Sequence, residues 1–351
     1  MRPSPGTLAL DGNGWATLLK VTTAAPGRWR PLGIVAALAL GALSVVGARL
    51  LWDRTPAARF VEYPMPAPQL APIAIAAAAD GSVWFTIDRA DTIGRLRDGV
   101  IERLPTPGRN FEPLGLAVAA DGSAWYTDIV AGAIVRISPS GEAARFALDS
   151  PLVRLGRLAI APDGSAWFAD STGYGITQLQ NGTFKRHEVG PAGEGPYGVA
   201  VAADGTVWAT LPGGSKLLRI APGGSLLTID LPRRGSGPTD IAVGADGSVW
   251  FLQFRSNRIG QLKEGKFADF EVAKQNAGLS GLAVANDGAV WFGMVRSSSL
   301  GRLRGGRVET FRLPRDNARP YSVAVDPTGN IWYADISGYV GMLPARNTRG
   351  P

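Results

Sequence analysis

The sequence predicts an all-β fold, a seven-bladed β-propeller of four-stranded blades with a repeat of about 41 residues, preceded by one N-terminal transmembrane helix. Two observations carry this prediction. An uncharged apolar stretch occupies residues 32–48, ahead of the repeats. Behind it, tryptophans recur at intervals of 41 or 42 residues, namely Trp84, Trp125, Trp167, Trp208, Trp250, Trp291 and Trp332.

The beginning of the chain has the pattern of a membrane anchor. Leu50, Leu51 and Trp52 extend the apolar stretch, so that residues 32–52 approach the ~20 residues of a membrane-spanning helix. Four basic residues and one acid precede this segment, and the positive-inside tendency therefore assigns residues 1–31 to the cytoplasm. We expect a linker at residues 53–58 and a propeller on the periplasmic or extracellular side of the inner (cytoplasmic) membrane.

A cleaved signal peptide is the alternative interpretation of the same segment. Small residues such as Gly47 and Ala48 lie near a suitable cleavage position, although a leader of 31 residues ahead of the apolar core is long for a signal peptide. In that case the propeller would be secreted or periplasmic.

Each repeat predicts four short strands. A glycine stands three residues before each tryptophan, after an aspartate in the first six repeats, and this pair predicts a tight hairpin because glycine accepts positive φ. Apolar runs such as Leu116–Val118 predict first, innermost strands, and pairs such as Trp84–Phe85 predict second strands. Ile93–Leu96 is typical of the third strands, and the alternating Val308–Leu313 of half-exposed fourth strands.

The ends of the repeat region predict how the ring closes. The propeller is expected over residues 59–343, because the last repeat stops after its third strand near Val340–Leu343. The segment Phe60–Pro64 has the pattern of an isolated fourth strand, and we expect it to complete the seventh blade. Such closure would remove the exposed edges of an open array. Residues 344–351 are expected to be a loose tail.

Charge and composition exclude two classes of function. The net charge is +7, but residues 1–54 hold six Lys/Arg against two acids, which leaves 30 Lys/Arg against 27 acids in the remainder. A nearly balanced body without clustered basic residues argues against a nucleic-acid partner. The chain has no cysteine, so disulfides, cysteine-ligated zinc and thiolate nucleophiles are excluded.

The repeat motif resembles a known family. The segment Gly195–Trp208, together with Trp84–Thr86 and Ile93–Leu96, is similar to the streptogramin B (virginiamycin B) lyases, and the resemblance covers residues 59–343. It implies a seven-bladed propeller that opens a cyclic depsipeptide antibiotic by elimination. It also implies a magnesium ion, histidines in a first-strand Pro-x-Gly motif and a glutamate three residues after a blade tryptophan.

The catalytic part of this pattern is missing from the sequence. The positions that match the family's histidine motif are Leu114, Tyr197, Thr239 and Tyr321. The chain's one histidine, His187, lies in an expected outer strand, where we predict a solvated edge residue. No catalytic residue is therefore assigned.

Acidic residues suggest a site at the axial mouth, where the second strands end. Asp128, Asp170 and Asp335 each follow a blade tryptophan by three residues, and Asp88 follows Trp84 by four. Converging aspartates are ligands for a divalent cation such as Mg²⁺ or Ca²⁺, so these four are the candidate metal ligands. The alternative is that each caps a loop or pairs with a basic neighbour. The candidate ligand-binding residues at the same mouth are Tyr197, Asp240, Arg255, Arg296 and Tyr321.

Three functions remain open at this point. The first is a membrane-tethered propeller that binds a small molecule or a protein at its mouth without the family's histidine chemistry. The second is a metal-assisted carbon–oxygen lyase or a lactone or ester hydrolase, in which a cation acts as Lewis acid. The third is an architectural module whose blade edges dock a partner. The sequence favours the first, because the family histidines are absent.

Overall fold

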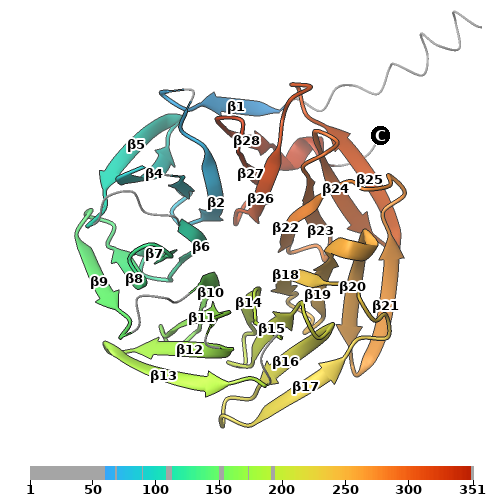
Figure 1. Cartoon of the computed structure of the whole chain (residues 1–351). Coiled ribbons are helices and arrows are strands. Elements are labelled where there is room, and N and C mark those ends of the chain that lie inside the picture. The colour runs from blue at the N-terminus through green and yellow to red at the C-terminus, as the bar shows by residue number, and fades with distance from the viewer. Residues whose placement is uncertain are drawn as a thin grey trace, which may run out of the picture. The chain divides into compact units, whose positions relative to one another are not determined.

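Seven antiparallel sheets of four strands each make up the described part of the chain, and they stand around a common axis like the blades of a propeller (Figure 1). The computed structural model describes residues 60–348 except residues 68, 89, 108–112, 150–153, 173 and 191–193. Each first strand contacts the first strands of its two neighbours, and β26 contacts β2, so the ring is closed. The predicted seven-bladed propeller of four-stranded blades is confirmed.

The strands have the predicted order within each blade. The first, innermost strands are β2 (Pro72–Ala77), β6 (Pro113–Val118), β10 (Leu155–Ile160), β14 (Val199–Val201), β18 (Pro238–Val243), β22 (Leu279–Val284) and β26 (Pro320–Val325). The second strands, which carry the tryptophans, are β3 (Val83–Ile87), β7 (Ala124–Asp128), β11 (Ala166–Asp170), β15 (Val207–Leu211), β19 (Val249–Gln253), β23 (Val290–Met294) and β27 (Ile331–Asp335). The third strands are β4 (Thr92–Arg97), β8 (Ala133–Ile137), β12 (Gly175–Gln180), β16 (Lys216–Ile220), β20 (Arg258–Lys263), β24 (Ser299–Arg304) and β28 (Tyr339–Leu343). The fourth, outer strands are β5 (Val100–Pro105), β9 (Ala143–Ala147), β13 (Thr183–Glu188), β17 (Leu226–Asp230), β21 (Lys266–Glu271), β25 (Arg307–Arg312) and β1 (Val61–Pro64).

The seventh blade is completed by the beginning of the propeller, as predicted. Its strand order is β1-β28-β27-β26, and Val61 of β1 lies opposite Met342 of β28. Figure 1 shows β1 beside β28 at the outer edge of this blade. The ring therefore closes by backbone pairing between the two ends of the repeat region.

Two repeated glycines have local steric reasons. In the first hairpin Gly81 has a φ of 82°, and the Asp80 carboxylate accepts a hydrogen bond of 2.9 Å from the Ser82 N–H. In the third strand Gly94 faces the Phe85 ring, and a Cβ at this position would lie 2.1 Å from that ring. The aromatic residue that follows the tryptophan thus requires the glycine of the Ile-Gly-Arg-Leu motif.

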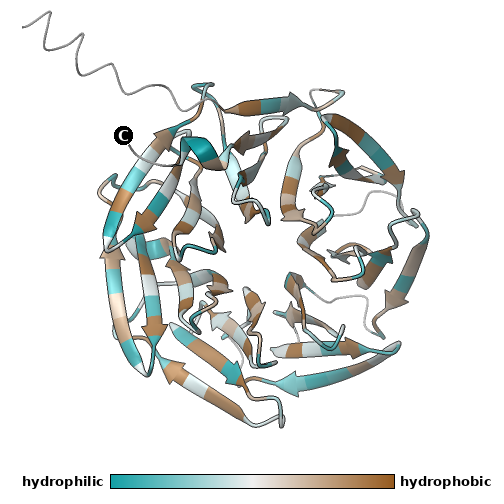
Figure 2. Cartoon of the chain, turned by 180° about the vertical axis from the view of Figure 1, so that it is seen from behind, coloured by the Kyte–Doolittle hydropathy of each residue, from teal (hydrophilic) through white to brown (hydrophobic). Residues whose placement is uncertain are grey.

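The hydrophobic core is divided among the contacts between neighbouring blades. One of its clusters, for example, joins Trp84 and Ile93 of the first blade to Ala124 and Tyr126 of the second. Corresponding clusters join the other neighbours, including the seventh blade to the first. Hydrophilic and hydrophobic residues alternate along the outer strands (Figure 2), which fits their half-exposed position. Each blade is stabilised mainly by its two neighbours.

The predicted anchor at residues 32–52, with residues 1–31 and the linker at 53–58, lies outside the described residues. Within the described part, no helix is long and apolar enough to cross a membrane. At the other end, residues 344–348 of the expected tail are ordered against the propeller. A short 3₁₀ helix (Ala345–Asn347) forms there, and the Ala345 N–H donates a 2.9 Å hydrogen bond to the side chain of Asn330.

Candidate functional site

A cavity of about 870 Å³ opens at the axial mouth, where first strands begin and second strands end. We call it the mouth pocket. It is lined by blades 3 to 7, with Arg157, Tyr197, Thr239, Asp240, Phe254, Gly278, Leu279, Ser280, Val295, Arg296, Ser298, Asp316, Asn317, Ala318, Arg319, Tyr321 and Ile336. Its size is suited to a small molecule or to a few residues of a peptide.

Four of the five candidate ligand-binding residues line this pocket, namely Tyr197, Asp240, Arg296 and Tyr321. Arg255 does not. It lies in a short 3₁₀ helix (Phe254–Ser256), where its side chain packs beside Gly237, and the preceding Phe254 lines the pocket instead. The Phe254 ring is 47% exposed and adds an apolar surface that the sequence patterns did not indicate.

An ion pair joins the innermost strands of blades 3 and 5 at this pocket. Arg157 of β10 donates two hydrogen bonds to the Asp240 carboxylate of β18, at 2.8 and 3.1 Å. The side chains are 13% and 11% exposed. Asp240 also accepts from the Gly281 N–H at 2.8 Å, and Arg157 donates to the Leu114 carbonyl at 3.1 Å. This axial pair, Arg157 and Asp240, therefore connects four blades of the ring.

Two tyrosines flank the axial pair. The Arg157 guanidinium carbon lies 6.0 Å from the ring centre of Tyr197 and 5.9 Å from that of Tyr321. Burial disfavours the charge on Arg157, but the neighbouring Asp240 carboxylate, together with Tyr197 and Tyr321, outweighs this effect and raises the pKa of the guanidinium. Burial also raises the pKa of Tyr197, so its hydroxyl stays protonated and can donate a hydrogen bond.

Arg157 was missed by the sequence analysis, although the repeat contains a signal for it. Ten residues before each blade tryptophan the chain has a small residue in five blades, namely Ala74, Gly115, Gly198, Gly281 and Ser322. The two exceptions at this position are Arg157 in blade 3 and Asp240 in blade 5. Two charged exceptions of opposite sign in innermost strands indicate a pair across the ring.

Two further arginines give the rim of the pocket a positive charge. The axial pair is neutral as a unit, and Asp316 pairs with Arg312 at 2.6 Å. Arg296 and Arg319 are exposed, and neither side chain makes an ion pair with any residue that the structure describes. Arg296 donates a hydrogen bond to the Asn276 side-chain oxygen. The pocket thus combines apolar lining with two uncompensated guanidinium groups.

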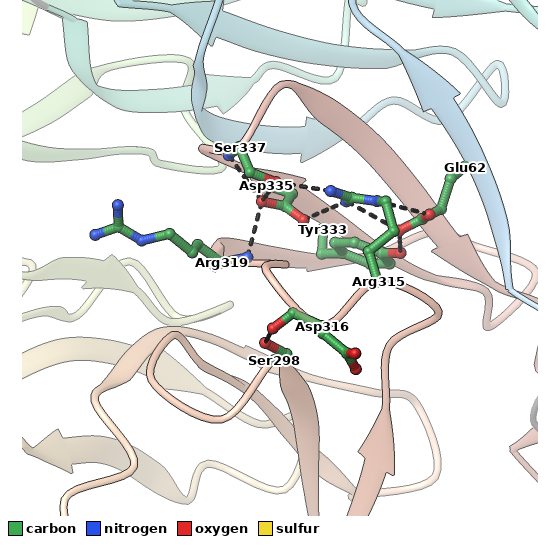
Figure 3. A network of polar contacts seen from close by, with 8 residues as sticks. All are labelled: Glu62, Ser298, Arg315, Asp316, Arg319, Tyr333, Asp335 and Ser337. Carbon is green, nitrogen blue, oxygen red and sulfur yellow. Dashed lines mark hydrogen bonds and ion pairs between the residues drawn. The ribbon is translucent and has the colours of Figure 1, made fainter.

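Both carboxylate oxygens of Asp335, a candidate metal ligand, accept hydrogen bonds from other residues of the protein (Figure 3). Its side chain is 0% exposed. One oxygen accepts hydrogen bonds from the N–H groups of Arg319 and Ser337, at 2.9 and 2.8 Å, and from the Ser337 hydroxyl at 2.7 Å. The other accepts from Arg315 at 2.5 Å. Figure 3 shows the Arg319 side chain directed away from this carboxylate.

The other three candidate metal ligands also lie apart from the mouth pocket. Asp128 is buried, which raises its pKa, and it accepts a 3.0 Å hydrogen bond from the Ala131 N–H. Asp170 is buried at the end of β11, and Asp88 is half-buried after β3. Among the described residues, no three acidic or histidine side chains form a group that could hold a metal ion. The cation site at these four aspartates stays a prediction.

His187 is buried, so the prediction of a solvated edge residue is wrong. It lies on β13 opposite Ile176, is 8% exposed, and stacks on Trp167 with ring centres 5.3 Å apart. Phe146 stacks on the tryptophan of its blade in the same way, and Phe270 and Phe311 contact theirs with tilted rings. Successive side chains of the outer strand point to opposite faces of the blade, and the side chain at position 187 is on the face that packs against the tryptophan. Its Nε2 has no hydrogen-bond partner among the described residues, and the side chain lines a different cavity from the mouth pocket.

Replacing His187 with phenylalanine is expected to flatten the pH dependence of the free energy of unfolding. Burial, together with the positive charge of Lys185, lowers the pKa of His187. The unfolded chain therefore gains a proton before the folded chain does, and the wild type loses stability as the pH falls below about 6.5, by up to about 1.4 kcal/mol per pH unit. Asp163 and Asp204, the acids of the same cleft, are present in both proteins.

Urea unfolding at a series of pH values measures this difference. The stability of the wild type should fall relative to that of His187→Phe on acidification. Parallel profiles for the two proteins would contradict the prediction.

Comparison with known proteins places these features in context. A model of the virginiamycin B lyase family matches residues 52–181 and 153–348. A virginiamycin B lyase of Nocardia farcinica (strain IFM 10152) is 32% identical over 162 residues, which cover 46% of this chain and 55% of that protein. The chain thus matches little more than half the length of this curated relative.

Solved structures give the same picture of the fold. A streptogramin B lyase superimposes with a TM-score of 0.78 at 25% identity, covering 81% of this chain and 96% of that one. A catalytically inactive virginiamycin B lyase from Staphylococcus aureus with quinupristin has a TM-score of 0.77 at 24% identity, covering 81% and 98%. The second likeness supports the fold alone.

Proposed function

Because this chain belongs to the virginiamycin B lyase family, we propose that it uses the family's propeller to bind a ligand at the axial mouth, without histidine-based elimination. The ligand class is an anionic small molecule with an apolar body, or an acidic peptide segment of similar chemistry. The observation that carries this proposal is the mouth pocket itself. It combines the exposed Phe254 ring with Arg296 and Arg319, neither of which forms an ion pair within the part of the chain that the structure describes.

The floor of the pocket supports binding rather than elimination. An elimination requires a base that removes a proton from the substrate. The chain's single histidine, His187, lies on β13 away from the pocket, and the axial carboxylate Asp240 is already held by Arg157. The hydroxyls of Tyr197 and Tyr321 are hydrogen-bonded to each other, so this pair has one hydroxyl proton left to donate to a bound oxygen. The lyase activity named for the relatives therefore does not follow for this chain.

The N-terminal anchor predicted from the sequence is a further part of this proposal. Residues 32–52 would tether the propeller to the inner membrane, with the mouth pocket on the periplasmic or extracellular side. A protease-protection experiment on membrane vesicles of defined orientation tests this placement. Digestion of the propeller only in vesicles that expose the cytoplasmic face would contradict it.

Naphthalene-2-sulfonate is a suitable probe for the pocket, because it joins one anionic group to an apolar ring system. We expect the full chain to bind it, with affinity falling as ionic strength rises. Replacing Arg296 with alanine should weaken binding about 10-fold, which corresponds to about 1.4 kcal/mol. Replacing Phe254 with alanine should weaken it by a similar factor, because an aromatic contact is lost. Isothermal titration calorimetry measures both effects.

Arg307→Ala is the matched control, because Arg307 is an exposed arginine on the outer strand β25 and does not line the pocket. Its affinity for the probe should equal that of the wild type. Equal affinity in Arg296→Ala and the wild type would refute the anionic-ligand proposal. Ring opening of a streptogramin B antibiotic by the purified chain would refute the absence of elimination chemistry.

A further inference from the structure

One wall of the mouth pocket is held from a distant part of the chain. This wall is the loop between blades 6 and 7, residues 315–319, of which Asp316, Asn317, Ala318 and Arg319 line the pocket. The loop is fixed at both ends by polar contacts (Figure 3). Its last residue, Arg319, donates its backbone N–H to Asp335 at 2.9 Å.

The first residue of this loop connects it to the N-terminal strand. Arg315 donates to the Asp335 carboxylate at 2.5 Å, and through Nε and Nη2 to the Glu62 carboxylate of β1 at 3.0 and 3.1 Å. Glu62 accepts a further hydrogen bond of 2.8 Å from the Tyr333 hydroxyl. The side chains of Arg315 and Glu62 are 19% and 14% exposed. Little water is therefore available to replace these contacts, and the charges are strongly coupled.

This loop and the preceding loop of the ring are each held locally by the side chain that follows a blade tryptophan by seven residues, and in the 315–319 loop the Ser298 hydroxyl donates a 2.6 Å hydrogen bond to the Asp316 carbonyl. Between blades 5 and 6, the Ala277 N–H donates to the side chain of Asn257, in the same blade as the start of that loop, at 3.1 Å. In addition to its local contact, the 315–319 loop has Arg315, which reaches a partner 253 residues away in the sequence. The contact with β1 is thus one of the interactions that hold the 315–319 loop, beside those made by Ser298 and Asp335.

We propose that strand β1 positions the wall of the mouth pocket, with Glu62 as a positioning residue that acts through Arg315 on the 315–319 loop. Seating of β1 and binding of a ligand at the mouth are then coupled. By linkage, a ligand that contacts this wall strengthens the seating of β1 by the same factor by which seating strengthens binding. The ligand part of this inference rests on the proposed function, whereas the positioning of the loop does not.

Hydrogen–deuterium exchange of the full chain, without ligand, tests the positioning. Replacing Glu62 with leucine is expected to speed exchange in a peptide that covers residues 315–319. Glu62→Gln keeps an acceptor for Arg315 and Tyr333 and should restore part of the protection. The matched control is Glu102→Leu on the outer strand β5, which breaks the 2.6 Å ion pair of Glu102 with Arg95 and touches no part of the mouth pocket. This control should leave the 315–319 peptide unchanged.

The same variants test the coupling with naphthalene-2-sulfonate as the probe. At a temperature where all of them remain folded, Glu62→Leu should bind the probe about 5-fold more weakly, whereas Glu102→Leu should bind it like the wild type. Faster exchange in β1 alone, with the 315–319 peptide unchanged, would overturn the positioning role. Faster exchange in the loop with unaltered affinity would overturn the coupling. If the wild type does not bind the probe, the proposed function fails, and the exchange result alone decides whether Glu62 positions the loop.

Discussion

Replacing Asp335 with alanine is expected to lower the free energy of unfolding by about 3–5 kcal/mol, the range for removing one partner of a buried ion pair. The carboxylate is fully buried and accepts from Arg315, from the backbone of Arg319 and from both donors of Ser337. Alanine would remove the acceptor of the Arg319 and Ser337 N–H groups and the carboxylate that binds the Arg315 guanidinium, and each loss is unfavourable.

Urea unfolding followed by tryptophan fluorescence measures this loss, and Asp316→Ala provides the control. Asp316 belongs to the same segment and pairs with Arg312 at 2.6 Å, but both side chains are exposed, so its removal should change stability by less than about 1 kcal/mol. A loss at Asp335 no larger than that at Asp316 would show that the buried contacts do not hold the seventh blade.

Loss of Asp240 from the axial pair is expected to lower the free energy of unfolding by a similar amount, whereas replacing both charged residues should cost less. Asp240→Ala leaves the Arg157 guanidinium nearly buried without its carboxylate and should cost about 3–5 kcal/mol. The double variant Arg157→Met, Asp240→Leu removes both charges and replaces them with apolar side chains of similar size. It should be clearly more stable than Asp240→Ala, because no unpaired charge remains at the axis.

A double-mutant cycle in urea measures the interaction between the two sites. The single variants Arg157→Met and Asp240→Leu complete the cycle. Additive losses in the double variant would mean that the two residues do not depend on each other, in conflict with the bidentate contact at 2.8 and 3.1 Å.

The blades and the ring closure could be predicted from the sequence because their causes are local and repeated. Each tryptophan, such as Trp84, lies at a fixed distance from a hairpin glycine, and the hairpin fixes which strands pair. The isolated segment Phe60–Pro64 could be assigned to the seventh blade because that blade alone lacked a fourth strand. The repeated sequence motif is therefore sufficient to predict the blades and their order in the ring.

The side chains at the mouth were harder to predict because their partners come from different blades. The spacing correctly indicates that Asp128 and Asp335 end second strands, but not whether a carboxylate there points toward the axis. Both accept hydrogen bonds from the backbone that follows the strand, at Ala131 and Ser337, as the alternative of loop capping anticipated. The pairing of Arg157 with Asp240 joins residues 83 positions apart, and no single repeat contains that information.

The pairing of β1 with β28 sets the order in which the protein can mature. Strand β1, which contains Val61, is synthesised early. Its partner β28 contains Met342 and is synthesised 281 residues later. Until then six blades can stack while the seventh lacks its outer strand, so the nascent protein carries an unpaired edge through most of its synthesis. Contacts of such long range make folding slow, and an unpaired edge invites aggregation. The last blade of the ring thus provides the pairing partner of the first strand of the ring, and a chain truncated within β28 would leave β1 without its partner.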